Sequence, residues 1–491
     1  MAIASPRGRA DGPWTPVDER DALPDVPPWL IVAGALVCAA VFGHLLAGGK
    51  MKYGIAVVLV ICYGPLVFFD LSRALALWVA ILFFSDISVL SSGPNGVGVL
   101  IGLGWLGAFL GGRGTVFVRE HRRLLSVIVL FLLWVTLTIT WSQNTADAAN
   151  EAAYWALAGL AFLVVLTTIK TPEAAGRLAL AFLVGSLISV IIGLGTGSLA
   201  PSTSNAVTNT AVQGRFSGGG GDPNQQAAAF VAAMFLAIGL FSLYRRKAVR
   251  IALTAGFIVV AIGFFATESR GGLVALAVAA LAALALAPGQ RRRVVGLIVL
   301  VAAAGAILVA TTPGALTRIT NLGGGTSGRS DLWRVGWDVF SGHPLFGIGA
   351  GNFVVVEAHY VLRPGAISRI QYLVDVPHLV HNTYLQIAAE TGLVGLLGYA
   401  TVIVGSLWSG YRAARRFDVL GLTRYADLTR AIMMGTIGML AALFFITDGD
   451  DLRLWVLLAL GPALFGIAGR MAAEHAAPPG DAEPLQAAAP R

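Results

Sequence analysis

Long runs of apolar residues recur along most of this chain, and they constrain its fold more than any other feature of the sequence. A helix needs about 20 mostly apolar residues to cross the hydrocarbon core of a bilayer. Only helices and closed barrels satisfy every backbone polar group there, and these runs lack the period-two alternation of barrel strands. With 56% hydrophobic and only 12% charged residues, the chain is predicted to be an all-α polytopic membrane protein rather than a soluble enzyme.

The apolar runs predict about 12–14 transmembrane helices, with the first four runs separated by short connections. The predicted spans are Trp29 to Gly48, Tyr53 to Phe69, Ala74 to Leu90, Val97 to Leu110, Leu124 to Thr140, Ala152 to Leu166, Leu178 to Leu194, Ala227 to Leu243, Ile251 to Ala266, Leu273 to Ala287, Val294 to Thr311, Gly392 to Leu407, Ala431 to Ile446 and Leu454 to Ala468. Both cysteines, Cys38 and Cys62, fall in spans, where they are expected to pack as small apolar residues.

The basic residues set the orientation, because positive loops stay on the cytoplasmic side of a membrane. With the N-terminus inside, four clusters fall in cytoplasmic loops: Arg113 to Arg123, Arg245 to Arg250, Arg291 to Arg293 and Arg412 to Arg430. Both termini are then cytoplasmic. This topology accounts for the net charge of +8 without a nucleic-acid partner, and the bilayer is the predicted partner of the helices.

The predicted organisation follows from the spans. A cytoplasmic tail (residues 1–28) precedes a helical block (29–311) that includes an extracytoplasmic loop (195–226). An extracytoplasmic cap segment (312–391) lies between the eleventh and twelfth predicted spans, and C-terminal helices (392–470) and a disordered cytoplasmic tail (471–491) follow. The cap segment is rich in aromatic residues and is predicted to be folded, with a short helix from Ser330 to Ser341.

Three arginines on the extracytoplasmic side oppose the charge rule. Arg215, Arg270 and Arg329 each lie beside glycines, and a guanidinium group stays charged and binds phosphate oxygens through paired donors. They are predicted to bind a diphosphate. The alternative is that they extend to the membrane interface or pair with nearby Glu268, Asp222 and Asp331.

The segment Asp222-Pro223-Asn224 follows four glycines and is typical of a helix start, with a capping Asp and a proline in the first turn. A helix N-terminus attracts anions, so this segment could help to hold a phosphate. The alternative is an ordinary helix start.

Four histidines, His343, His359, His378 and His381, lie in the cap segment. His381 is the predicted general base, because it opens a helix whose N-terminus disfavours the imidazolium and keeps the ring neutral. Its alternative role is to cap that helix. The spacing of His378 and His381 allows a metal ligand pair, but no third ligand is evident, so no metal and no cofactor are predicted.

The sequence Asp448-Gly449-Asp450-Asp451 superficially matches the metal motif of enzymes that use nucleotide sugars. It lies in a short extracytoplasmic loop, where nucleotide sugars are not expected. We therefore interpret it as a solvated turn.

Taken in order, these residues resemble the O-antigen ligase and polymerase superfamily. The resemblance covers the chain from about Arg215 to Tyr399, and the N-terminal third is similar only as generic membrane helices. It is carried by the motifs Arg215 with Gly218, Pro223-Asn224, Ser269-Arg270-Gly271-Gly272, Gly328-Arg329 with Trp333, Pro344, Gly347, Gly349 and Phe353, His381-Asn382, and Glu390-Thr391-Gly392 with Gly395.

The resemblance implies an inverting, metal-independent glycosyltransferase in the bacterial cytoplasmic membrane. It would move a glycan from a polyprenyl diphosphate carrier to an acceptor hydroxyl, on a glycan or lipid-linked acceptor, at the extracytoplasmic side. Carried over to this sequence, Arg215 and Arg329 would bind the donor diphosphate, and Arg270 would assist or contact the acceptor. His381 would be the catalytic base, with Asn224, Asn382, His378 and Glu390 in supporting roles.

Two other classes remain open from the sequence. A flippase for a lipid-linked sugar would move the donor without consuming it, although no internal repeat is evident. A receptor or scaffold would need no base, so it would tolerate the loss of the His381 imidazole.

Overall fold

The structure is a computed structural model that describes residues 63–84, 93–110, 120–195, 216–218, 222–311, 329–363 and 378–476. The chain divides into two compact units, Met1–Phe69 and Asp70–Arg491. All helices named below belong to the second unit. The predicted span Trp29 to Gly48, both cysteines and Arg215 lie outside the described residues.

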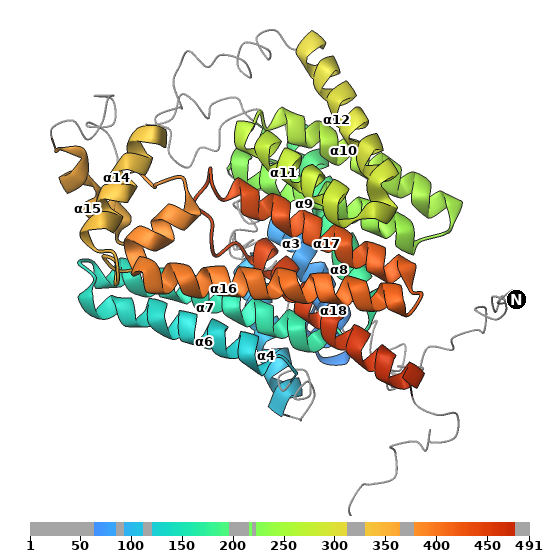
Figure 1. The fold of residues 1–491 in the computed structure, drawn as a ribbon, viewed down its shortest axis with the longest axis horizontal. Coiled ribbons are helices and arrows are strands. Elements are labelled where there is room, and N and C mark those ends of the chain that lie inside the picture. Colours follow the sequence, from blue (N-terminus) through green and yellow to red (C-terminus); the bar gives the residue numbers. More distant parts are fainter. Residues whose placement is uncertain are drawn as a thin grey trace, which may run out of the picture. The chain divides into compact units, whose positions relative to one another are not determined.

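The described part of the second unit consists of helices and their connections, without strands, and the predicted all-α class is confirmed (Figure 1). The helices are α3 (Leu71–Ile81), η1 (Leu82–Phe84), α4 (Gly93–Leu110), α6 (Arg122–Leu137), η2 (Thr138–Trp141), α7 (Thr145–Thr168), α8 (Pro172–Gly195), α9 (Pro223–Leu243), α10 (Lys247–Ala266), α11 (Arg270–Leu286), η4 (Pro288–Gln290), α12 (Arg291–Thr311), α14 (Arg329–Gly342), α15 (Phe353–Val361), α16 (Thr383–Val419), α17 (Thr423–Ala442) and α18 (Leu452–Ala476).

Seven of the described helices are long and apolar enough to cross a membrane, with α6 and η2 counted together. The count rises to eight if α11 and α12, which meet at a bend of 112°, form one span. The polytopic membrane class is therefore confirmed. Each predicted span from Ala74 onward overlaps a helix, while the total of about 12–14 spans stays a prediction.

Helix α9 lies at the centre of the bundle. It packs against α8, α10, α11 and α17, and its residues from Gln226 to Leu240 are all buried. A second group is formed by α6, α7, α16 and α18, in which α6 and α18 each pack against both α7 and α16 (Figure 1). The outer faces expose large apolar side chains such as Leu130, Leu133 and Ile251, as a lipid-facing surface requires.

Helix α16 begins at Thr383, nine residues before the predicted span, and is kinked where that span was expected to begin. The kink is at Gly392, whose backbone has a φ of 69° and a ψ of −171°. A Cβ at this position would lie 2.1 Å from the carbonyl oxygen of Leu345. Glycine is therefore required here for two reasons, the left-handed backbone and the close approach of another segment.

The segment Pro344–Ile348 replaces the hydrogen bonds that the kink interrupts. In a regular helix, Leu393 N would donate to Ala389 O. Here Leu393 N donates to Pro344 O at 2.8 Å, while Ala389 O accepts from Ile348 N at 3.1 Å. The next carbonyl, Glu390 O, accepts from Gly349 N at 2.8 Å. The kink therefore leaves these buried groups paired and attaches the cap segment directly to α16.

The cap segment has its own apolar core, formed by α14, α15 and the beginning of α16. Its buried members are Val335, Val339, Ile348, Phe353, Val361, Val380 and Ala389. Three of the aromatic residues of this segment, Trp333, Phe340 and Tyr360, pack against this core. At the other side, Asn352 exchanges hydrogen bonds with the backbone of Asn144, at 2.7 Å and 3.1 Å, and so joins the cap segment to the start of α7.

Two predicted boundaries are wrong. Helix α14 begins at Arg329, one residue before the predicted start at Ser330. Helix α18 continues to Ala476, because the alanine-rich sequence after Met471 favours helix, and the predicted tail begins too early at residue 471.

We expect Gly392→Ala to destabilise the fold, because an alanine must adopt a left-handed backbone and displace the Leu345 carbonyl group. Backbone strain alone costs about 1–3 kcal/mol. The melting temperature of the purified protein in detergent measures the effect. Gly107→Ala is the matched control, since a Cβ at Gly107 meets nothing within 4 Å. Equal melting temperatures for the two variants would contradict the role assigned to the kink.

Candidate active site

His381 lies immediately before α16, in a conformation that few side chains adopt. Its φ is 52°, which is left-handed, and its side chain is half-buried. The N-cap of α16 is Asn382, whose side chain accepts a hydrogen bond from Leu385 N at 3.1 Å. Because Asn382 caps the helix, the alternative role of His381 as the cap is wrong, and its imidazole is available for another purpose.

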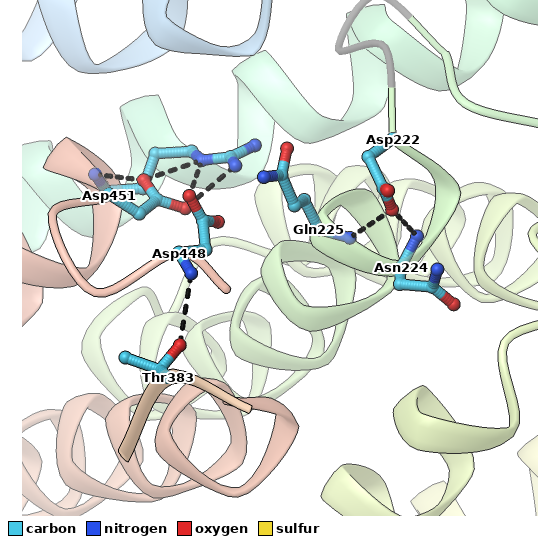
Figure 2. Close-up of polar contacts among 7 residues, drawn as sticks. Asp222, Asn224, Gln225, Thr383, Asp448 and Asp451 are labelled. Atoms are coloured by element: carbon cyan, nitrogen blue, oxygen red, sulfur yellow. Dashed lines mark hydrogen bonds and ion pairs between the residues drawn. The ribbon is translucent and has the colours of Figure 1, made fainter. Parts of the chain in front are cut away.

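The first turn of α16 is held by the connection between α17 and α18. Thr383 N donates to the carbonyl oxygens of Leu443 and Ile446, both at 2.9 Å. The Thr383 hydroxyl donates to Ile446 O at 2.8 Å and accepts from Asp448 N at 3.0 Å, a contact drawn in Figure 2. Both the N–H and the hydroxyl of Thr383 are therefore hydrogen-bonded to this connection. These bonds fix the backbone two residues after His381.

The electrostatic surroundings of His381 come from three other segments. Burial lowers the pKa of His381, and the positive charge of Arg329 lowers it further, with a smaller contribution from His378. The carboxylate of Asp222 acts in the opposite direction. The net shift is downward, so the ring is neutral at pH 7 and able to accept a proton. The sequence predicted a neutral ring from the helix N-terminus, whereas burial is the main cause.

Asp222 is the N-cap of α9, as predicted. Its carboxylate accepts hydrogen bonds from Asn224 N at 2.6 Å and Gln225 N at 3.2 Å, with Pro223 in the first turn (Figure 2). The Asn224 side-chain oxygen accepts from the Ser269 hydroxyl at 2.8 Å, and Ser269 in turn caps α11 by accepting from Gly272 N at 3.1 Å. The N-termini of α9 and α11 are therefore joined.

The helix starts around His381 form one cluster. Asp222 begins α9 and Arg329 begins α14, and the charges of both act on His381 at the start of α16. The Ser269 contact adds the start of α11 to this group. Helix N-termini carry positive potential, so the approach of these helix starts to one another favours an anionic ligand.

The three arginines predicted to bind a diphosphate differ in what the structure describes of them. Arg329 is partly buried and lies close enough to His381 to change its pKa. Arg270 is the exposed first residue of α11, next to the capping Ser269. Arg215 itself is outside the described residues, but Phe216, the next residue, is buried and donates its N–H to Ala266 O at 3.2 Å, near the start of α11.

His378 is positioned by a carboxylate that the sequence analysis did not single out. Glu357 of α15 is 3% exposed, and its Oε2 accepts from His378 N at 2.7 Å, while its Oε1 lies 3.8 Å from His378 Nδ1. Burial raises the pKa of Glu357, and the hydrogen bond from His378 partly opposes this. An acidic residue that follows four apolar residues in a short helix was the available signal for this contact.

Glu390, a predicted supporting residue, joins α16 to the start of α15. Its carboxylate is buried and accepts from Gly351 N at 2.9 Å, Phe353 N at 3.2 Å and Gln386 Nε2 at 3.1 Å. The side chain of Asn352, the N-cap of α15, makes no capping hydrogen bond, and Glu390 instead accepts from the N–H of Phe353 in the first turn. Its contacts are structural, and they hold the cap segment on α16 near His381.

The interpretation of Asp448 to Asp451 as a solvated turn is wrong. The side chain of Asp451 is 7% exposed and forms an ion pair with Arg453 at 2.8 Å. Burial raises the pKa of Asp450 to about 6 and that of Asp448 well above its usual value. This connection packs against the start of α16, and its acidic residues are held by the protein. Among the described residues, no group of three or more His, Cys, Asp and Glu side chains is placed to hold a metal ion.

These features define a class of protein: a polytopic helical membrane protein with a half-buried neutral histidine and an arginine among converging helix N-termini. Residues 255–400 match the family model described as O-antigen ligase. The match covers part of the chain and supports the predicted resemblance to the O-antigen ligase and polymerase superfamily. The family implies a glycosyltransferase of the ligase or polymerase type. A comparison with curated proteins finds no match for the chain.

We expect Asn382→Ala to loosen the start of α16, because it removes the side-chain acceptor for Leu385 N. Loss of such a cap costs about 1 kcal/mol. Thermal unfolding should show the loss, and hydrogen exchange should rise at the first turn of α16. Asn382→Asp keeps an acceptor and is the matched control. If Asn382→Ala and Asn382→Asp have the same stability, the cap assigned to Asn382 is incorrect.

Proposed function

We propose that this protein transfers a glycan from a polyprenyl diphosphate carrier to an acceptor hydroxyl, with His381 as the general base. The observation that carries the proposal is the placement of a neutral imidazole beside Arg329 and among four helix N-termini. The family match supports the class of reaction. A diphosphate leaving group supplies an activated donor, so the protein must chiefly orient a hydroxyl and neutralise developing charge.

The proposed reaction is a direct displacement. The imidazole of His381 accepts the proton of the acceptor hydroxyl, whose oxygen forms a bond to the anomeric carbon of the donor. The bond from that carbon to the diphosphate oxygen breaks, and the electron pair leaves with the diphosphate. Attack from the face opposite the leaving group inverts the anomeric centre. The proton on His381 is then released to solvent or to the departing phosphate.

The diphosphate would be held by guanidinium groups and backbone N–H groups. Arg329 is the first candidate, because it begins α14 and acts on His381. Arg215 and Arg270 complete the proposed set, and Asn224 and Ser269 shape the adjoining helix starts. Positive groups in these positions stabilise the charge that develops on the leaving oxygen, and this proposal assigns that task to arginines rather than to a metal.

The proposed site faces the extracytoplasmic side of a bacterial cytoplasmic membrane. His381 and Asp222 lie at the opposite end of α9 from the basic segment Arg245–Arg250. Positive loops remain on the cytoplasmic side, which puts the helix starts outside. A donor whose lipid stays in the bilayer would reach this end from the membrane, and acceptors such as a lipid-linked glycan or a lipid A core would meet it there.

The test uses the purified full chain, a polyprenyl-diphosphate-linked glycan and candidate acceptors in the presence of EDTA. We expect transfer with release of free polyprenyl diphosphate, and a loss of about 10²–10⁴-fold in His381→Ala, as for other general bases. His359→Ala is the matched control, because His359 is an exposed histidine of α15. Full activity of His381→Ala in folded protein would remove it as the base. Movement of donor across vesicles without carrier release would indicate a flippase.

The pH dependence gives a second test. Because burial and Arg329 hold the pKa of His381 below its usual value in the free protein, kcat/KM for the donor should stay constant near pH 7 and fall only in more acidic solution. Arg329→Gln removes a positive charge, which raises the pKa of His381 and moves the acidic limb to higher pH, towards about 6.5. Arg334→Gln is the control, an exposed residue of the same helix. An acidic limb that stays in place in Arg329→Gln would contradict the proposed interaction.

A further inference from the structure

A cavity of about 180 Å³ lies at the end of α9 opposite the candidate active site. Helices α9, α10 and α12 form its walls, through residues that include Phe241, Phe257, Leu297 and Gly296. The 21 residues of α9 place this end roughly 30 Å from Asp222. The cavity is therefore separate from the site that contains His381.

The walls of this cavity are apolar, and its neighbourhood faces lipid. Thr254 and Arg293 supply the polar side chains of the lining. On the outer faces of α10 and α12, Ile251 is 61% exposed and Val299 is 63% exposed. Exposed apolar residues of this kind on spanning helices contact acyl chains, so the cavity adjoins the hydrocarbon region of the bilayer.

Arginines border the cavity at its polar end. The guanidinium carbon of Arg250 lies 3.9 Å from the centroid of the Phe241 ring, which lines the cavity. The Nε of Arg250 is buried and has no hydrogen-bond acceptor among the described residues. A buried guanidinium N–H without an acceptor is costly, which points to an anionic oxygen from a ligand.

The second arginine is partly neutralised. Arg293 lies 3.5 Å from the carboxylate of Asp427 and donates to Ser242, and its guanidinium carbon is 5.9 Å from the Phe241 ring. The adjacent Arg245, Arg246 and Lys247 are exposed and add positive charge at the same end. The single carboxylate of Asp427 is therefore outnumbered by basic side chains, and the electrostatic potential at this end of the cavity is positive.

We propose that this cavity binds an anionic phospholipid of the cytoplasmic leaflet. One acyl chain occupies the apolar space between α9, α10 and α12, and the headgroup phosphate accepts a hydrogen bond from Arg250 Nε. Basic clusters between transmembrane helices recognise anionic headgroups in this manner, and positive loops lie on the cytoplasmic side. The apolar lining explains why the ligand is a lipid rather than free phosphate. The proposal does not depend on the glycosyltransferase reaction.

The experiment measures lipid retention by the full chain in detergent, with bound lipids counted by native mass spectrometry during titration with phosphatidylglycerol or phosphatidylcholine. Wild type should prefer phosphatidylglycerol. Arg250→Gln should weaken phosphatidylglycerol binding about fivefold, since one basic residue near an anionic headgroup contributes about 1 kcal/mol. Arg250→Lys keeps the charge and should keep the preference. Arg123→Gln, at the exposed start of α6, is the matched control and should bind as wild type.

A second variant tests the cavity without a change of charge. A Cβ at Gly296 meets nothing within 4 Å, so Gly296→Leu can fill the space that the acyl chain would occupy. We expect loss of phosphatidylglycerol retention at an unchanged melting temperature. Three results would overturn the proposal: equal retention of both lipids by wild type, unchanged retention in Gly296→Leu, or displacement of the lipid by millimolar inorganic phosphate.

Discussion

The backbone exchange at Gly392 is the interaction on which the rest of the structure depends. A kink in a long apolar helix frees N–H and C=O groups that cannot remain unpaired, and the segment Pro344–Gly349 pairs with them. This exchange joins the cap segment to α16, and the carboxylate of Glu390 adds bonds to Gly351 and Phe353. Because the cap segment and α16 share these bonds, the start of α16 and the start of α14 keep a fixed relation, and with them His381 and Arg329.

The electrostatics of the candidate site follow from this arrangement. The proposed reaction combines a neutral base with a permanent cation, and the charge of Arg329 acts on His381. Arg329 favours the neutral form of His381, while Asp222 opposes it from the start of α9. Burial decides the balance. The positive charge of Arg329 that lowers the pKa of the imidazole also suits a diphosphate, so in the proposed reaction one arrangement of charges would serve both the base and the leaving group.

Much of this architecture is predictable from the sequence, and the reasons for the remainder are physical. Apolar runs identify the helices, and the Asp222-Pro223 start was recognised because capping chemistry is local. The sequence does not predict the kink at Gly392, because its cause is the approach of Leu345, which is far away in the sequence. The same holds for the ion pair of Asp451 with Arg453, whose burial depends on packing, and for the contact of Glu357 with His378. The helix start at His381 is visible in the sequence and predicts a neutral imidazole, but burial, the main cause of its low pKa, is not visible there.

The order of residues in the chain adds a consequence for assembly. The segment Pro344–Phe353 is made before α16, whose Ala389 and Glu390 supply the acceptors for its N–H groups. Its other partners, Thr138 and Asn144, are made long before it. During synthesis this segment can bind to the helices made before it, but its hydrogen bonds to α16 cannot form until the ribosome has released that helix. The end of the molecule that carries His381 is therefore completed only when α16 has been inserted.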